Sequence, residues 1–339
     1  MTKSLKEFKD SYLELLINFL WRQWSALGVA GNADTRDRWI IDPEALLLFT
    51  CTIGRYDARL FDEVLDWLNV NGNFVNIQRL RNILRKEQFR GDKVISAVAN
   101  VMKIRTKSYK WKLLAVLNQN EYMNKTEPLF FFKDGKPIEN YGKTDEDFRY
   151  YGFLRGKKEL TGKTQQVNIV KNTGMLFKLR ALFGVNTRCE IILYLLVHES
   201  AHPSLIAREI YYSQKTVQDT LIEMTQSGLI FVRSVGKEKQ YTLYKDKWYE
   251  FLKYDNEPLQ WVNWAQVLSA LEKIWIKLND KNMLEYDSLL QSSELRVLMH
   301  EIRPKIENAG FPQALTNDSY FLGEKYSEIF IQDIKKLLG

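Results

Sequence analysis

The sequence has few residues of the types that build disulfides and metal centres. Among its 339 residues are two cysteines, Cys51 and Cys189, and three histidines. Both cysteines fall in apolar helical runs, which predicts buried free thiols rather than a disulfide, as in a reducing compartment. Two cysteines allow no structural zinc cluster, and no Ser-His-Asp arrangement is indicated. We therefore expect no catalytic residues, no metal and no cofactor, and predict that the protein is not an enzyme.

Long hydrophobic runs are also missing. No apolar stretch approaches the roughly 20 residues that a membrane-spanning helix needs. Near the N-terminus, Glu14 and Asn18 interrupt the apolar positions, which is unlike a signal peptide. The remaining composition, 45% hydrophobic and 27% charged, is that of an ordinary globular chain with two or three domains. We expect a soluble, cytoplasmic protein that does not contact membranes.

Two of the three histidines lie four residues apart. The segment His198-Glu199-Ser200-Ala201-His202 matches the H-E-x-x-H pattern of zinc hydrolases. That chemistry requires both imidazoles on one helix face, with the glutamate polarising a metal-bound water. Pro203 follows directly, and proline disfavours helical geometry at the residue before it. We predict a helix end and a loop here, with a zinc hydrolase as a remote alternative.

Gly142-Lys143-Thr144 and Gly162-Lys163-Thr164 lack the leading glycine of a phosphate-binding loop.

Helical periodicity dominates both ends of the chain, so the fold class predicted is mainly α and multi-domain. Residues 1–125 are predicted to form an all-helical domain, in which Asp42 and Pro43 mark a helix start. Residues 126–165 are predicted to hold a hairpin around Asp134-Gly135 and then a linker or a long ordered loop. Residues 253–339 form a helical region, in which Pro304 is a position where a helix can break. These helices either form a dimer interface or pack onto the N-terminal domain.

The predicted central domain, residues 166–252, has a different order of elements. Apolar residues at helical spacing predict three helices, the second opening at Pro203 and the third capped by Ser213. The third helix turns Val217, Leu221 and Met224 inward. Two β-rich segments, 229–235 and 240–244, flank a charged tip that contains a glycine and therefore predict a hairpin.

This order resembles the winged helix-turn-helix of MarR-type and ArsR-type bacterial regulators. The resemblance covers residues 187–252 and is carried by Ile191-Leu195-Leu196, Leu205–Ile210, Ser213-x-x-Thr216-Val217-x-x-x-Leu221, Ser227–Ile230 and Tyr241-x-Leu243. It implies that the third helix enters the major groove of double-stranded DNA and that the hairpin, the wing, contacts the backbone or the minor groove.

By this resemblance, base edges or phosphates would be contacted from the third helix, its preceding turn and the wing. The residues expected to do so are Gln214, Lys215, Thr216, Gln218, Tyr212, Arg233, Lys237 and Lys239. Asp219 and Glu223 lie on the same helix and leave it with a net negative charge, which is unfavourable beside phosphates.

Positive charge is concentrated in two stretches of a chain whose net charge is +7. Residues 79–112 contain eleven basic residues and two acidic ones, and residues 149–180 contain eight and one. Each stretch is either a solvated helix face or a phosphate-contacting surface.

Together these features predict a DNA-binding transcriptional regulator that binds duplex DNA, forms a homodimer and responds to a small-molecule or protein effector. The alternative is a winged-helix module that binds protein, such as an antitoxin-like or assembly component.

Overall fold

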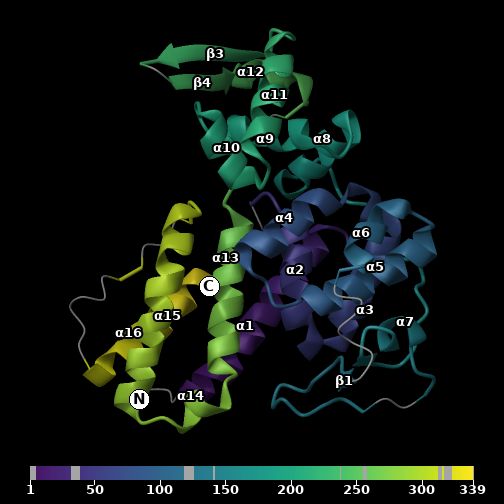
Figure 1. The fold of residues 1–339 in the computed structure, drawn as a ribbon, viewed down its shortest axis with the longest axis vertical. Helices are drawn as coiled ribbons and strands as arrows, with labels where there is room; N and C mark the ends of the chain where they lie inside the picture. The colour runs from purple at the N-terminus through teal and green to yellow at the C-terminus, as the bar shows by residue number, and fades with distance from the viewer. Residues whose placement is uncertain are drawn as a thin grey trace.

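The computed structural model describes residues 5–31, 39–117, 126–139, 142–236, 238–254, 258–311, 315–316 and 323–338. The chain is mainly α-helical, as predicted, and its elements form two groups (Figure 1). Within the described ranges, no helix has the length and apolar character required to cross a membrane.

The larger group, which we call the helical body, is built from both ends of the chain. Its N-terminal helices are α1 (Leu5–Ala26), α2 (Pro43–Ile53), α3 (Ala58–Asn71), α4 (Ile77–Glu87), α5 (Asp92–Thr106), α6 (Lys112–Ala115) and α7 (Glu146–Arg149). Its C-terminal helices are α13 (Trp264–Leu278), α14 (Lys281–Glu285), α15 (Ser288–Asn308) and α16 (Tyr326–Leu338). Short 3-10 turns are η1 (Gly54–Tyr56), η2 (Gly72–Phe74), η3 (Tyr109–Trp111) and η7 (Gly323–Lys325).

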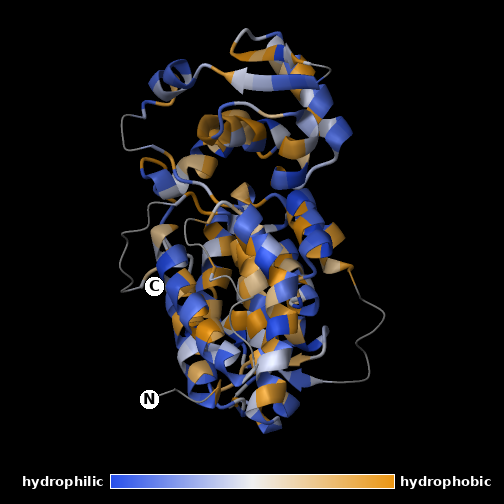
Figure 2. Cartoon of the chain, turned by 90° about the vertical axis from the view of Figure 1, so that its left-hand side faces the viewer, coloured by the Kyte–Doolittle hydropathy of each residue, from blue (hydrophilic) through white to orange (hydrophobic). Residues whose placement is uncertain are grey.

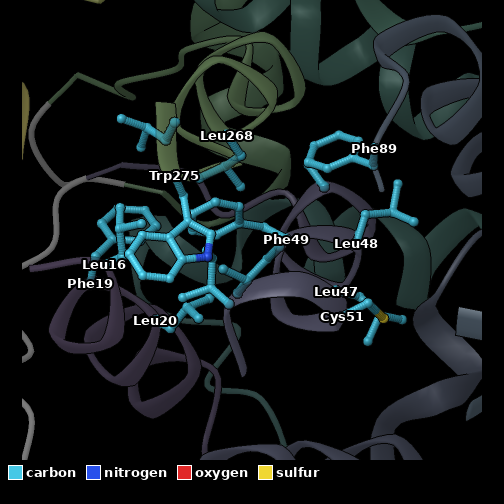
Figure 3. Packing of buried hydrophobic residues seen from close by; sticks show 14 of the residues in the cluster. Leu16, Phe19, Leu20, Leu47, Leu48, Phe49, Cys51, Phe89, Leu268 and Trp275 are labelled. Carbon is cyan, nitrogen blue, oxygen red and sulfur yellow. The ribbon is translucent and has the colours of Figure 1, made fainter. Parts of the chain in front are cut away.

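One hydrophobic core unites these helices, so the C-terminal region packs onto the N-terminal one. In Figure 3, Leu16 and Leu20 of α1 and Phe49 of α2 surround Trp275 of α13. α15 continues through Pro304 without a break. Ile302 and Ile306, on either side of that proline, are fully buried, and their packing holds the helix together. Figure 2 shows that hydrophilic and hydrophobic residues alternate along these helices, as expected when one face of each packs inward.

Residues 142–165 form a long ordered loop that packs on the body, rather than a linker. Phe148 and Phe153 are buried, and the buried guanidinium of Arg155 binds Asp62 at 2.7 Å. The predicted hairpin around Asp134-Gly135 is present but short. Phe131 and Pro137 form one bridge, and the N–H groups of Phe132 and Ile138 donate to the carbonyls of Lys136 and Phe130 at 2.8 and 3.0 Å. Strands β1 (Glu127–Pro128) and β2 (Phe153–Leu154) pair in parallel, a pairing that the sequence analysis missed because each strand is only two residues long.

The smaller group, which we call the hairpin unit, has its own hydrophobic core. It comprises α8 (Met175–Phe183, after the turn η5, Asn172–Gly174), α9 (Thr187–Val197), α10 (Pro203–Ile210), α11 (Gln214–Thr225), β3 (Ile230–Val235), β4 (Glu238–Leu243) and α12 (Lys245–Phe251). β3 and β4 are antiparallel, with Ile230 opposite Leu243 and Val235 opposite Glu238. β3 ends at Val235, as predicted, whereas β4 begins at Glu238, two residues closer to the tip than predicted. Gly236 adopts the left-handed conformation (φ +64°) that a tight turn requires. Outside these two strands, Ala201 forms an isolated antiparallel bridge with Tyr241.

The two cysteines are free and buried, as predicted. Burial raises the pKa of both thiols, that of Cys189 to about 11. Because the thiolate is the reactive form, we expect neither cysteine to react with a thiol-specific disulfide reagent in the folded protein at neutral pH. Both should react once the protein is unfolded in urea. Rapid labelling of the native protein at either position, detected by mass spectrometry, would contradict this.

Candidate nucleic-acid interface

The outward face of α11 is open to solvent. The hydroxyl of Ser213 caps the helix by accepting a hydrogen bond from the Thr216 N–H at 3.1 Å. Val217, Leu221 and Met224 are buried in the hairpin unit, as their spacing predicts. The opposite face presents four exposed residues of the predicted site, Gln214, Lys215, Thr216 and Gln218. No part of the described chain therefore covers the amino-terminal half of this face.

Tyr212 does not belong to this exposed face, which corrects the expectation that it contacts phosphate. Its ring is partly buried, and its hydroxyl accepts a hydrogen bond from the side-chain amide of Asn76 at 2.6 Å. Burial raises the pKa of this phenol. Tyr212 therefore lies at the contact between the hairpin unit and the helical body.

The wing residues lie on the hairpin, at the end of the molecule far from α14 and β1 (Figure 1). Arg233 on β3 and Lys239 on β4 are both exposed. The Arg233 guanidinium lies 3.4 Å from the Ser200 hydroxyl, which holds it beside the loop before α10. Lys237 falls outside the described residues. Lys215 on α11 and Lys239 on the hairpin thus supply exposed positive charge from two elements of one unit.

An ion pair between α9 and α11 offsets part of the negative charge on α11. Arg188 and Glu223 meet at 2.6 Å, and both side chains are largely exposed. Arg188 thereby neutralises one of the two acids that argue against DNA binding. No local pattern in the sequence marks Arg188, because the two partners are 35 residues apart and only tertiary packing brings them together.

The two basic stretches are not continuous surfaces. Arg79, Arg155 and Arg180 are buried in ion pairs, and the ammonium of Lys110 donates to two backbone carbonyls. Figure 1 also places α7, next to Arg155, far from the hairpin. The buried basic residues of the two stretches therefore cannot contact phosphate.

A buried ionic network joins the hairpin unit to the body beneath α11. Arg180 of α8 binds Glu44 of α2 at 2.7 Å and Glu190 of α9 at 2.6 Å. Arg79 of α4 binds Glu44 at 2.6 Å and also Asp42, the cap of α2, at 2.7 Å. Burial opposes the charge of the Asp42 carboxylate, but Arg79 outweighs it and holds the Asp42 pKa below its usual value. For Glu190 burial outweighs Arg180, and its pKa is raised.

The turn between α10 and α11 is fixed by side chains of α4. The guanidinium of Arg79 donates to the carbonyl of Ile210 at 3.2 Å, and the amide of Asn82 donates to that of Tyr211 at 2.9 Å. Tyr211 has a left-handed backbone (φ +63°) and donates its hydroxyl to Glu87 at 2.8 Å. This turn sets the position of α11 on the body.

The H-E-x-x-H segment does not form a zinc site. α9 ends at Val197, His198 is extended, and His202 caps α10 by accepting a hydrogen bond from the Ser204 N–H at 3.2 Å. His198 stacks on Tyr194, and burial lowers its pKa. In the part of the chain that the structure describes, no three histidine, cysteine or acidic residues gather as metal ligands.

The loop at Gly162-Lys163-Thr164 wraps around an acid instead of a phosphate. The backbone N–H groups of Gly162 and Lys163 donate to the carboxylate of Asp66 at 2.7 and 3.0 Å. The backbone N–H groups that a bound phosphate would use are therefore already bonded to a carboxylate of the same chain.

Comparison of the chain with protein-family models, with curated proteins and with solved structures found no match.

Proposed function

We propose that the protein is a DNA-binding regulator, in which α9, α10, α11 and the β3–β4 hairpin act as a winged helix-turn-helix on duplex DNA. The exposed amino-terminal face of α11 carries this proposal. It presents Gln214, Lys215 and Gln218 together, side chains suited to base edges and phosphates, while the opposite face is buried. The resemblance in the order of elements supports the same function.

The hairpin adds a second contact region. In this mode of binding, α11 lies in the major groove while the wing, with Arg233 and Lys239, follows the adjacent backbone. Phosphate contacts of this kind release counterions, so the affinity falls steeply with salt concentration. A pair of such units in a homodimer would contact two half-sites about one helical turn apart.

Charge reversal at Lys215 tests the proposal. We expect Lys215→Glu to raise the Kd for random-sequence duplex about tenfold or more, because it replaces a contact worth about 1–3 kcal/mol by a repulsion. Lys239→Glu should also weaken binding and reduce the slope of log K against log salt by about one. Fluorescence anisotropy with labelled duplex at several salt concentrations measures both.

The matched control is Lys325→Glu, which changes the net charge equally at an exposed lysine just before α16, far from the hairpin in Figure 1. The control should bind DNA like the parent protein. If the parent shows no salt-sensitive DNA affinity, or if all three variants bind equally, α11 and the wing are not the DNA interface.

Exposed apolar residues on the same unit favour the second candidate function, a protein-interaction module. Val232 and Val235 of β3 are 46% and 54% exposed, and Ile222 of α11 is 48% exposed. A protein partner would cover such residues, whereas a phosphate backbone would not. Salt-insensitive association that Val235→Ser abolishes, together with no DNA binding, would select this alternative.

A further inference from the structure

A cleft of about 1000 Å³ opens in the helical body, away from the candidate DNA interface. It lies between the end of α2, the loop that joins α4 to α5, and the carboxyl-terminal half of α13. The residues of its lining that carry the argument are Thr52, Tyr56, Arg90, Glu272 and Trp275. Small-molecule sites are typically concave regions of a few hundred to about 1000 Å³ with a few placed polar groups, and this cleft has that form.

A buried carboxylate is the central polar group of the cleft. Glu272 is 1% exposed, accepts a hydrogen bond from the Thr52 hydroxyl and accepts another from the backbone N–H of Arg90 at 3.0 Å. An ionised carboxylate has about four acceptor positions, so roughly two remain for a ligand. Burial raises the pKa of Glu272 to about 7, although both hydrogen bonds and Arg90 lower it. A cation that reached this carboxylate would offset the desolvation of its charge.

Some of the cationic side chains around the cleft already have ion-pair partners, whereas Arg90 has none among the described residues. Lys273 pairs with Glu301, and Arg55 pairs with Glu127 at 3.0 Å and donates to backbone carbonyls. Arg90 is exposed and has no ion pair with any residue in the described ranges. The backbone N–H of Arg90 lies 3.0 Å from the Glu272 carboxylate, and both residues line the cleft, so a cationic side chain and a buried acid belong to one site.

Aromatic rings form another wall. Tyr56 and Trp275 meet edge to face with ring centroids 5.0 Å apart, and the indole of Trp275 packs into the core shown in Figure 3. Such a wall suits the aliphatic part of a ligand and excludes water from its charged end.

We propose that this cleft binds a small basic amino acid or peptide, whose side-chain guanidinium or ammonium group pairs with Glu272 and whose carboxylate pairs with Arg90. The neighbouring acid and cation set the class of ligand. A ligand with only a negative charge would be repelled by the Glu272 carboxylate, and a ligand with only a positive charge would leave Arg90 without a partner. Basic amino acids and short basic peptides have this chemistry.

Two helices that border the cleft, α4 and α13, connect it to the α10–α11 turn. α4 ends at the cleft loop and holds Tyr211 through Glu87 and the Asn82 amide. Asn263, which caps α13, donates its amide to Glu209 at 2.9 Å. Ser269 of α13 donates its hydroxyl to the Glu87 carbonyl at 3.1 Å. A ligand that bridges Arg90 and Glu272 therefore stiffens both supports of the turn. Only the regulatory meaning of this coupling rests on the proposed DNA-binding function.

Calorimetric titration of the full chain tests the binding site. The probes are L-arginine, agmatine, which lacks the carboxylate, and L-citrulline, which keeps the α-ammonium and carboxylate but has a neutral ureido group in place of the guanidinium. We expect saturable binding of L-arginine that Glu272→Gln weakens at least tenfold, and no binding of L-citrulline. Arg90→Ala should weaken L-arginine but leave agmatine unchanged. The matched control Glu285→Gln, an exposed acid on α14, should bind like the parent.

Hydrogen exchange of the protein without DNA tests the coupling. L-arginine should slow exchange in residues 209–212, and this slowing should be absent in Arg90→Ala, an exposed change that leaves the fold intact. No saturable heat with L-arginine, or an affinity for L-arginine in Glu272→Gln and Arg90→Ala equal to that of the parent, overturns the site. Binding without any change in residues 209–212 overturns the coupling. Neither outcome bears on whether the parent protein binds duplex DNA.

Discussion

Arg180→Ala is expected to lower the free energy of unfolding by about 3–5 kcal/mol, since removing one partner of a buried ion pair leaves the other charge uncompensated. The Arg180 side chain is fully buried and bonds to Glu44, to Glu190 and to the carbonyl of Phe74. Without it, Glu44 keeps Arg79, but Glu190 loses its hydrogen-bonded partner. Equilibrium unfolding in urea, followed by tryptophan fluorescence, measures the loss.

Two further variants make this result specific. Arg188→Ala removes an exposed arginine from an ion pair of similar length, and such pairs contribute about 0–1 kcal/mol. The double variant Arg180→Met, Glu190→Gln removes the charge that the single change leaves behind, so it should recover part of the stability. If Arg180→Ala costs no more than Arg188→Ala, the network does not hold the hairpin unit on the body.

Glu272→Gln is expected to stabilise the protein at pH 8 but not at pH 4.5. Burial raises the Glu272 pKa from 4.5 to about 7, so the folded state binds this proton more tightly than the unfolded chain does. Stability contributed by the group is therefore present below pH 4.5, is lost as pH rises from there, and is fully lost above about pH 7. The difference amounts to about 3 kcal/mol, and glutamine, which stays neutral, avoids it.

Urea unfolding of parent and variant at a series of pH values measures this effect as a difference between two curves. Glu301→Gln, at an acid on the cleft rim with a 56% exposed side chain, is the matched control and should change stability by less than about 1 kcal/mol at every pH. Parallel curves for the parent and Glu272→Gln would show that the buried carboxyl does not titrate near neutrality.

Local patterns were sufficient to predict the helices and the orientation of α11. The apolar spacing of Val217, Leu221 and Met224 fixes which side is buried, and the opposite side, with Gln214 and Lys215, is exposed as a consequence. The cap of α2 at Asp42 and the free, buried thiols follow from equally local signals. Whether this face binds DNA is a separate question that periodicity does not answer.

Predictions that depended on distant partners were wrong or absent. Tyr212 was expected beside phosphate, yet its hydroxyl meets Asn76, which is 136 residues away in the chain. Arg79 and Arg180 counted toward basic surfaces, although both are buried against acids. A count of charges along the sequence cannot distinguish a solvated arginine from a paired one, because the difference is made by the element that packs against it.

The sequence by itself determined where helices form, where they begin and which of their faces turn inward, since these depend on residues within a few turns of each other. Tertiary structure alone decided which charges are buried together and where a cleft remains. Glu44 and Arg180 are 136 residues apart, and Thr52 and Glu272 are 220 apart. Pairs at such separations are set by how whole helices pack, and no local spacing encodes that arrangement.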